Sequence, residues 1–161
     1  MTAKEFLRQY EYKAKQAERL REVYQTQQEK IDTIGSTLSN DAGMPHGTGI
    51  SRKTEDRAIK LAEAAANWKE AELEALIVKG EVFDTIRNIT GIEGEILYQR
   101  YINLHKWEEI CVMIPISRNG AHKAHRRALA IVEGILKEQG IEVYTHYQYS
   151  DSVRSGTQEP Q

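Results

Sequence analysis

The sequence predicts an all-α protein, in which a long antiparallel helical hairpin is followed by a trihelical, helix-turn-helix block. Two long segments carry apolar residues at spacings of three and four, which is typical of amphipathic helices. A third segment, residues 97–136, consists of short helical blocks and ends in a helix with a basic leading face. We therefore expect residues 1–90 to form the hairpin and residues 91–139 to form a separate domain.

The first long helix is expected to begin at Thr2, which forms a capping box with Glu5, and to end near Gly35. Its spaced apolar residues are Phe6, Tyr10, Ala17, Leu20, Tyr24, Ile31 and Ile34. The second long helix is expected between Thr54 and Ile89, with Trp68 and Ile86 beside its stripe. That stripe consists of Ile59, Ala62, Ala66, Lys69, Leu73, Leu76, Gly80 and Phe83. Because the helices match in length and neither stripe is wide, we predict that they pack as an antiparallel coiled coil.

Two segments are expected to lack regular structure. Residues 35–53 contain Pro45 and the glycines Gly35, Gly43, Gly47 and Gly49, which favours a flexible loop at the tip of the hairpin. No Gly-Lys-Ser or Gly-Lys-Thr opens the following helix, so this loop does not match a phosphate-binding pattern. Residues 140–161 show only a brief alternation of apolar residues and are predicted to be mostly disordered.

Three short helices are predicted in residues 91–139. Ile96, Leu97 and Tyr101 mark the first, and Trp107, Ile110 and Ile114 mark the second, with Trp107 in the core. Ser117 is placed to cap the third helix. The apolar face of this last helix consists of Ala121, Ala124, Ala128, Leu129, Val132, Ile135 and Leu136.

Positive charge is concentrated on the last helix, although the chain has a net charge of -2. Residues 117–129 contain no acidic side chain, and they contain Arg118, His122, Lys123, His125, Arg126 and Arg127. The link between the second and third helices is short, as in a helix-turn-helix pair whose last helix enters the major groove of DNA. Double-stranded DNA is therefore the expected partner.

The same block resembles region 4 of bacterial sigma factors. The resemblance rests on Arg100-Tyr101-Ile102, Trp107-Glu108-Glu109-Ile110, Ile116-Ser117-Arg118 and Arg127-Ala128-Leu129. More closely, residues 1–138 resemble the sigma-region-4-like regulators of phages and prophages of Gram-positive bacteria, a family that includes autolysin and late-gene regulators. This resemblance implies a sequence-specific transcriptional regulator that also contacts RNA polymerase.

The resemblance implies a role for each residue of the predicted DNA-binding set. Ser117 caps the recognition helix, and Arg118, Asn119 and Lys123 fall where region 4 reads base edges. His122, Arg126 and Arg127 fall near phosphates. Arg and Lys pair well with guanine, and Asn pairs with adenine, so the chemistry is consistent with these roles.

The chain departs from the family pattern in and beside the turn. Pro115 stands where a residue with positive φ is common, and proline cannot adopt that conformation, so the turn must follow another path. Gly120 weakens the helix by about 1 kcal/mol relative to alanine.

Several other classes of function find little support in the residues. His122 and His125 lack further ligands at metal-binding spacing, so neither a metal nor another cofactor is expected. Carboxylates are scattered and no nucleophile has a base nearby, so an enzyme is not expected. Cys111 is interpreted as a small core residue. Neither a membrane span nor a signal peptide is recognised, which predicts a cytoplasmic protein.

Two alternatives remain open from the sequence. The hairpin could make the chain an oligomer, such as a homodimer or the ring of a small-terminase-like DNA-packaging protein. The basic helix could also belong to a polymerase-binding protein that never reads bases. A ring-shaped assembly, a promoter footprint, and polymerase binding without a footprint would distinguish these classes.

Overall fold

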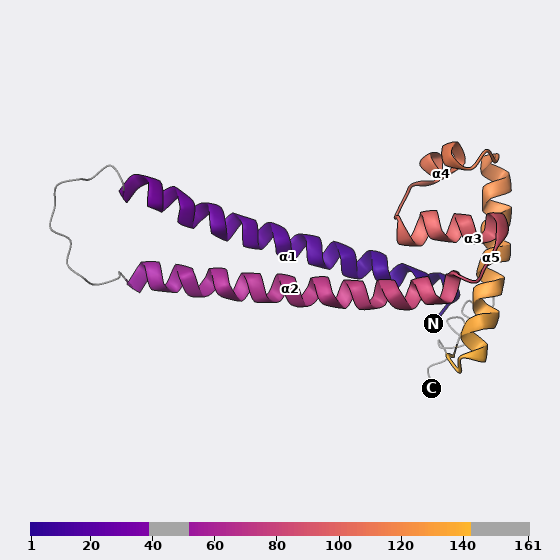
Figure 1. The fold of residues 1–161 in the computed structure, drawn as a ribbon, viewed down its shortest axis with the longest axis horizontal. Helices are drawn as coiled ribbons and strands as arrows, with labels where there is room; N and C mark the ends of the chain where they lie inside the picture. The colour runs from indigo at the N-terminus through magenta and orange to yellow at the C-terminus, as the bar shows by residue number, and fades with distance from the viewer. Residues whose placement is uncertain (39–51, 143–161) are drawn as a thin grey trace, which may run out of the picture. The chain divides into compact units, whose positions relative to one another are not determined.

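A computed structural model of the chain describes residues 1–38 and 52–142, and every regular element in these ranges is helical. The two long helices are α1 (Ala3–Leu38) and α2 (Arg52–Ile86). Next, α3 (Gly91–Leu97) runs directly into a π-helical turn, η1 (Tyr98–Ile102). The last two helices are α4 (Trp107–Met113) and α5 (Arg118–Glu138), as Figure 1 shows. The predicted all-α class is confirmed for the described residues.

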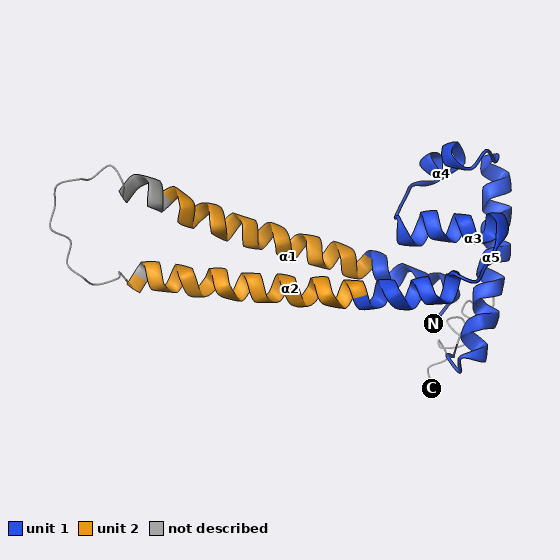
Figure 2. Cartoon of the chain, in the orientation of Figure 1, with its two compact units in different colours: residues 1–11, 77–161 blue, residues 12–76 orange. Residues whose placement is uncertain are grey.

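The chain divides into two compact units (Figure 2), which are residues 1–11 with 77–161, and residues 12–76. The sequence placed the boundary at residue 90, whereas the first unit also includes the start of α1 and the end of α2. The reason is packing, because both of these helix ends supply buried side chains to the same apolar cluster as α5.

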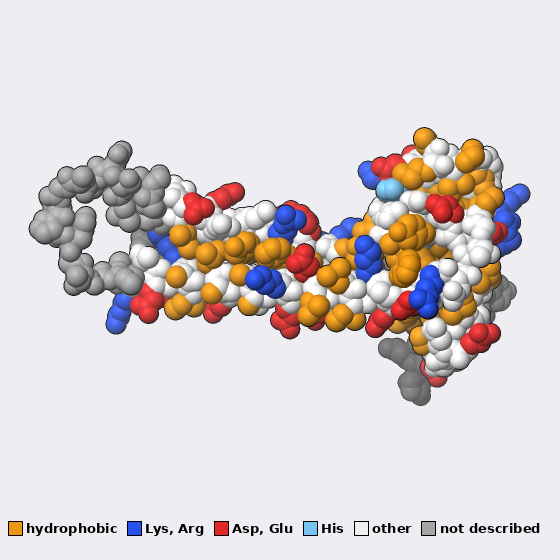
Figure 3. Space-filling model, in the orientation of Figure 1, with side chains coloured by type: hydrophobic (Ala, Val, Ile, Leu, Met, Phe, Trp, Pro, Cys, Tyr) orange, Lys and Arg blue, Asp and Glu red, His pale blue; other side chains and the backbone are white. Residues whose placement is uncertain are grey.

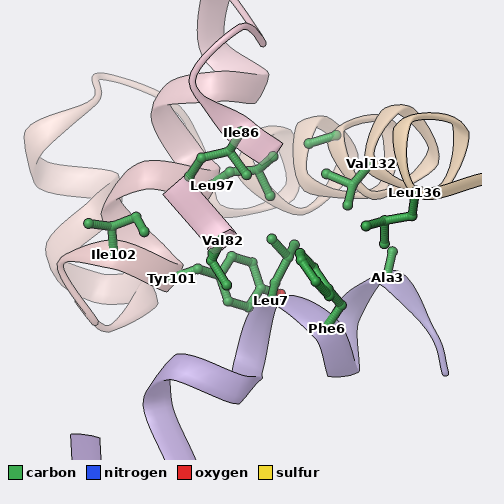
Figure 4. Close-up of a cluster of buried hydrophobic side chains, with 11 residues drawn as sticks. Ala3, Phe6, Leu7, Val82, Ile86, Leu97, Tyr101, Ile102, Val132 and Leu136 are labelled. Atoms are coloured by element: carbon green, nitrogen blue, oxygen red, sulfur yellow. The ribbon is translucent and has the colours of Figure 1, made fainter. Parts of the chain in front are cut away.

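The main cluster of the first unit joins residues from both ends of the chain (Figure 4). Leu7 and Val82, from the two long helices, expose none of their surface, and neither do Val132 and Leu136 of α5. The remaining members are Ala3, Phe6, Ile86, Leu97, Tyr101, Ile102 and Ala128. The eleven N-terminal residues of the chain are therefore part of the core around α5.

A second, smaller cluster joins α3, α4 and α5. Ile96, Ile110, Ala121 and Ala124 are fully buried in it. Trp107 and Cys111 are only half-buried and pack against its edge, together with Ile114 and Ile116. Trp107 is thus less enclosed than predicted, because its ring lies against His122 and His125 and not between apolar side chains.

The beginning of α1 agrees with the sequence. The Thr2 amide donates to Glu5 Oε2 at 2.7 Å, and the Glu5 amide donates to Thr2 Oγ1 at 3.2 Å, which completes the predicted capping box. The far end of α1 extends past Gly35 to Leu38, and α2 already begins at Arg52. The edges of the predicted loop are thus helical, and residues 39–51 lie outside the described ranges.

In the unit formed by residues 12–76, α1 and α2 run in opposite directions. An ion pair of 2.6 Å joins Lys13 to Glu74, and the rings of Tyr24 and Trp68 stack with centroids 5.3 Å apart. The predicted stripe of α1 faces inward, since Ala17 is buried and Leu20 is half-buried.

The stripe predicted for α2 is wrong. Its members Ile59, Leu73 and Leu76 expose 51%, 60% and 58% of their surface. The face of α2 that packs is formed by Leu61, Ala64, Trp68, Ala71 and Ala75. This face carries the same alternating spacing, and its small alanines allow the helices to approach closely.

The C-terminal end of α5 is closed by Gly140, whose φ of +75° lies in the left-handed region that favours glycine. The Ile141 amide donates to the Leu136 carbonyl at 3.0 Å, and Ile141 packs against the main cluster. The predicted disordered tail therefore begins with a cap, and residues 143–161 lie outside the described ranges. No described helix has the length and apolar character needed to cross a membrane.

Candidate nucleic-acid interface

The recognition surface predicted from the sequence begins with the turn between α4 and α5. Here the Ile116 amide donates to the Ile114 carbonyl at 2.6 Å, which closes a three-residue turn centred on Pro115. This is the different path that proline required. Ser117 then caps α5 as predicted, because its Oγ accepts from the Gly120 amide at 3.2 Å. A Cβ at Gly120 would lie 2.9 Å from Ile116 Cγ1, so this glycine allows the turn to fold closely over the helix.

The buried and exposed faces of α5 are cleanly separated. Ala121, Ala124, Ala128, Val132 and Leu136 expose none of their surface, which confirms most of the predicted apolar face; Leu129 and Ile135 are half-buried. The opposite face exposes Ser117, Asn119, Lys123 and Arg126. Three predicted DNA-binding side chains beyond the cap are therefore together on one accessible face of α5.

Two further arginines of the predicted set are engaged by carboxylates. Arg127 binds Glu93 of α3 with a nitrogen–oxygen distance of 2.8 Å, and the hydrogen bond from Arg127 lowers the pKa of Glu93. Arg127 therefore fastens α5 to α3. Arg118 lies 3.5 Å from Glu108 of α4, but both side chains are about two-thirds exposed, so this ion pair is weak.

His122 differs from the rest of the set because it is half-buried and packs on an aromatic ring. Its ring centroid is 4.6 Å from that of Trp107. Its neighbour His125 is buried, and the Tyr101 hydroxyl lies 2.9 Å from His125 Nε2. Burial raises the pKa of Tyr101 to about 12, so Tyr101 stays protonated and can donate this hydrogen bond to a neutral His125.

A pocket of about 210 Å³ opens beside these rings and was not anticipated from the sequence. Its lining combines Lys4 and Arg8 of α1, Arg100 and Tyr101 of η1, Trp107 of α4, and His122 and His125 of α5. We call it the cationic pocket. The sequence hinted only at part of it, since the elements that meet here are separated by ninety residues or more along the chain.

The arginines of the cationic pocket are held in place. The Arg100 guanidinium lies 5.7 Å from the centroid of the Trp107 ring, and its Nη1 donates to the His105 carbonyl at 2.8 Å. Arg8 is oriented by an ion pair of 3.3 Å with Glu11. Pre-positioned guanidinium groups bind oxyanions well because their donors are already oriented.

The electrostatic potential in the cationic pocket is positive. Burial, followed by the charges of Lys4, His122 and Arg100, lowers the pKa of His125 from 6.5 to about 4. None of the lining residues is acidic. The pocket can therefore accept an anion about the size of a phosphate group. In the described part of the chain, no group of three or more His, Cys, Asp or Glu side chains could hold a metal ion.

Comparison of the chain with protein-family models, with curated proteins and with solved structures finds no match. Function is therefore inferred from the site itself.

The buried His125 predicts a fold that weakens in mild acid. Because the pKa of His125 is about 4 in the folded chain and 6.5 as its ordinary value, the unfolded chain binds an extra proton between these pH values. The free energy of unfolding should therefore fall by about 2 kcal/mol from pH 7 to pH 5. Urea denaturation at both pH values measures this change. A His125→Gln variant cannot titrate there and should lose most of the fall; an equally steep fall in the variant would contradict the assignment.

Proposed function

We propose that residues 91–139 form a sigma-region-4-like helix-turn-helix, with which the protein binds promoter DNA in a sequence-specific manner and regulates transcription of phage or prophage genes. The observation that carries the proposal is the exposed face of α5, which presents Asn119, Lys123 and Arg126 directly after a capped N-terminus. Contact with RNA polymerase is a further part of the proposal and rests on the resemblance alone.

The short link between α4 and α5 supports this proposal. Only Ile114, Pro115, Ile116 and Ser117 separate the two helices, and Ile110 of α4 is buried against Ala121 and Ala124 of α5. Such packing fixes the second helix relative to the first while its N-terminal turns remain exposed, as a major-groove reader requires.

The cationic pocket supports backbone binding by the same unit. Most contacts between proteins and DNA go to phosphates, which set the register without carrying sequence information. Lys4, Arg8 and Arg100 offer such contacts beside α5, and His122 lines the same pocket. In this proposal, a phosphate approaches the cationic pocket while α5 reads the adjacent bases.

Packing refines the roles of the individual side chains. Lys123 and Asn119 are the best candidates for base reading, because both are exposed within the first two turns of α5. Arg118 can join them by leaving its exposed pair with Glu108. Arg126 suits a phosphate. Arg127 serves the fold first, since a DNA phosphate would have to displace Glu93 from it.

The test is selection of binding sites from a random DNA pool, followed by affinity measurements over a range of salt concentrations. Lys123→Ala and Arg118→Ala should each relax the preference at one base position by about 1 to 3 kcal/mol. Arg126→Ala should weaken binding to all sequences and reduce the salt slope by about one. Lys137→Ala, which removes an exposed cation from the last turn of α5, is the matched control and should change neither quantity.

Each outcome against the proposal has a distinct meaning. Uniform weakening by Lys123→Ala, with unchanged base preference, would assign Lys123 to a phosphate. A selected pool without any common motif would remove base reading altogether. If such a pool came with a ring-shaped assembly, DNA packaging would become the better explanation.

A further inference from the structure

A second apolar stripe runs along α2 on the face directed away from α1. It consists of Ile59, Ala62, Ala66, Lys69, Leu73 and Leu76, all of them exposed. We call it the outer seam. Ile59, Leu73 and Leu76 expose between 51% and 60% of their surface, although they are among the largest apolar residues of the helix. Figure 3 shows hydrophobic side chains at the surface along the outer edge of α2.

The outer seam has the spacing of a coiled-coil interface. Its members follow one another at alternating steps of three and four residues, which are the a and d positions of a heptad repeat. The inner face, with Leu61, Trp68 and Ala75, repeats the same alternation two residues later. Two residues turn an α-helix by about 200°, so the seams lie on opposite faces. Only the inner one is covered by α1.

We propose that the outer seam binds the outer seam of a second copy of this chain, as an antiparallel coiled coil. This inference does not depend on DNA binding. A seam with heptad spacing needs a partner helix with the same spacing, and an identical α2 supplies it. The outward side of α1 is a poorer match, because Lys15, Arg19, Glu22 and Lys30 are exposed there.

The sizes of the side chains favour the antiparallel orientation. Pairing residue 59 with residue 76 sets leucine or lysine of one copy opposite alanine of the other, at Ala62 with Leu73 and at Ala66 with Lys69. Large and small side chains then alternate across the interface and fill it evenly. A parallel pair would instead place alanine opposite alanine, leaving gaps, and Lys69 opposite its own copy.

The charges around the outer seam are also self-complementary in this orientation. Lys69 lies opposite Ala66 of the second copy, within one helical turn of Glu63 and Glu70 on that copy. The lysine stem can cover the alanine while the ammonium group reaches these exposed carboxylates. The one cation of the outer seam thereby meets opposite charges, whereas a parallel pair would oppose two cations.

Sedimentation of the full chain, from low micromolar to near-millimolar concentration, tests the proposal. The weight-average mass should rise from the monomer mass of 18.4 kDa towards twice that value. Leu73→Glu places a charge in the outer seam and should raise the dissociation constant at least tenfold. Val23→Glu is the matched control, because Val23 of α1 is 50% exposed and lies outside the outer seam. Circular dichroism should find both variants as helical as the natural chain.

The orientation is tested by mixing two single-cysteine chains, Ala62→Cys and Leu73→Cys, both with Cys111→Ser. After mild oxidation, the antiparallel pair should give the mixed disulfide between the two chains, identified by mass spectrometry. Disulfides joining only identical chains would overturn the antiparallel orientation. A natural chain that stays monomeric throughout, or an oligomer that Leu73→Glu leaves unchanged, would overturn the interface itself.

Discussion

Replacing Gly94 with alanine should cost the fold more than about 4 kcal/mol, an unusually large loss for one methyl group. Gly94 is buried in α3, and an alanine Cβ there would overlap the carbonyl oxygen of Ile89 and lie 2.8 Å from its carbonyl carbon. Backbone atoms cannot turn aside as a flexible side chain can, so α3 must move. Since Ile96 and Leu97 are fully buried in different clusters, this movement would disturb both.

Urea denaturation followed by circular dichroism measures the loss at Gly94, and Gly134→Ala provides the control. Gly134 lies in the middle of α5 with nothing within 4 Å of the new methyl group. That variant should therefore gain up to about 1 kcal/mol from the better helix propensity of alanine. Equal effects of the two variants would show that the close approach at Ile89 imposes no constraint.

Removing residues 1–11 should unfold the unit that contains α5. The deletion removes Ala3, Phe6 and Leu7 from the main cluster and uncovers Val132 and Leu136, which expose none of their surface. The point variant Leu7→Ala should already cost about 2 to 5 kcal/mol, the range for truncating a buried leucine. Thermal and urea denaturation measure both effects.

The control for Leu7→Ala is Val23→Ala, since Val23 is a half-exposed aliphatic residue of the same helix. It should change the free energy of unfolding by less than about 0.5 kcal/mol. A fragment that begins at Gly91 lacks Phe6, Leu7, Val82 and Ile86, so it should not fold cooperatively. If this fragment melted like the full chain, the main cluster would not stabilise α5.

Local signals in the sequence predicted local structure well. The capping box at Thr2 and the cap at Ser117 depend on side chains within three residues of one another, so both could be recognised without the fold. The buried face of α5 was predictable because its other face is strongly polar, which left one way to orient the helix.

Long-range packing could not be deduced in the same way. The helix α2 carries two apolar faces of equal periodicity, and spacing alone cannot decide whether Trp68 or Leu73 faces α1. Likewise, nothing near Lys4 or Arg8 indicates that they line a pocket with Arg100. Such meetings depend on which helix ends share a core.

The composition of the main cluster also determines when this unit can be completed during synthesis. Leu7 leaves the ribosome early, but the cluster in which it is buried also requires Val132 and Leu136. Contacts so distant in sequence form slowly, because a long stretch of chain must be closed before they stabilise anything. The pairing of α1 with α2 in residues 12–76 requires no later residue. A growing chain can therefore form the long helices first, while Phe6 and Leu7 remain exposed to solvent or chaperones until α5 has emerged.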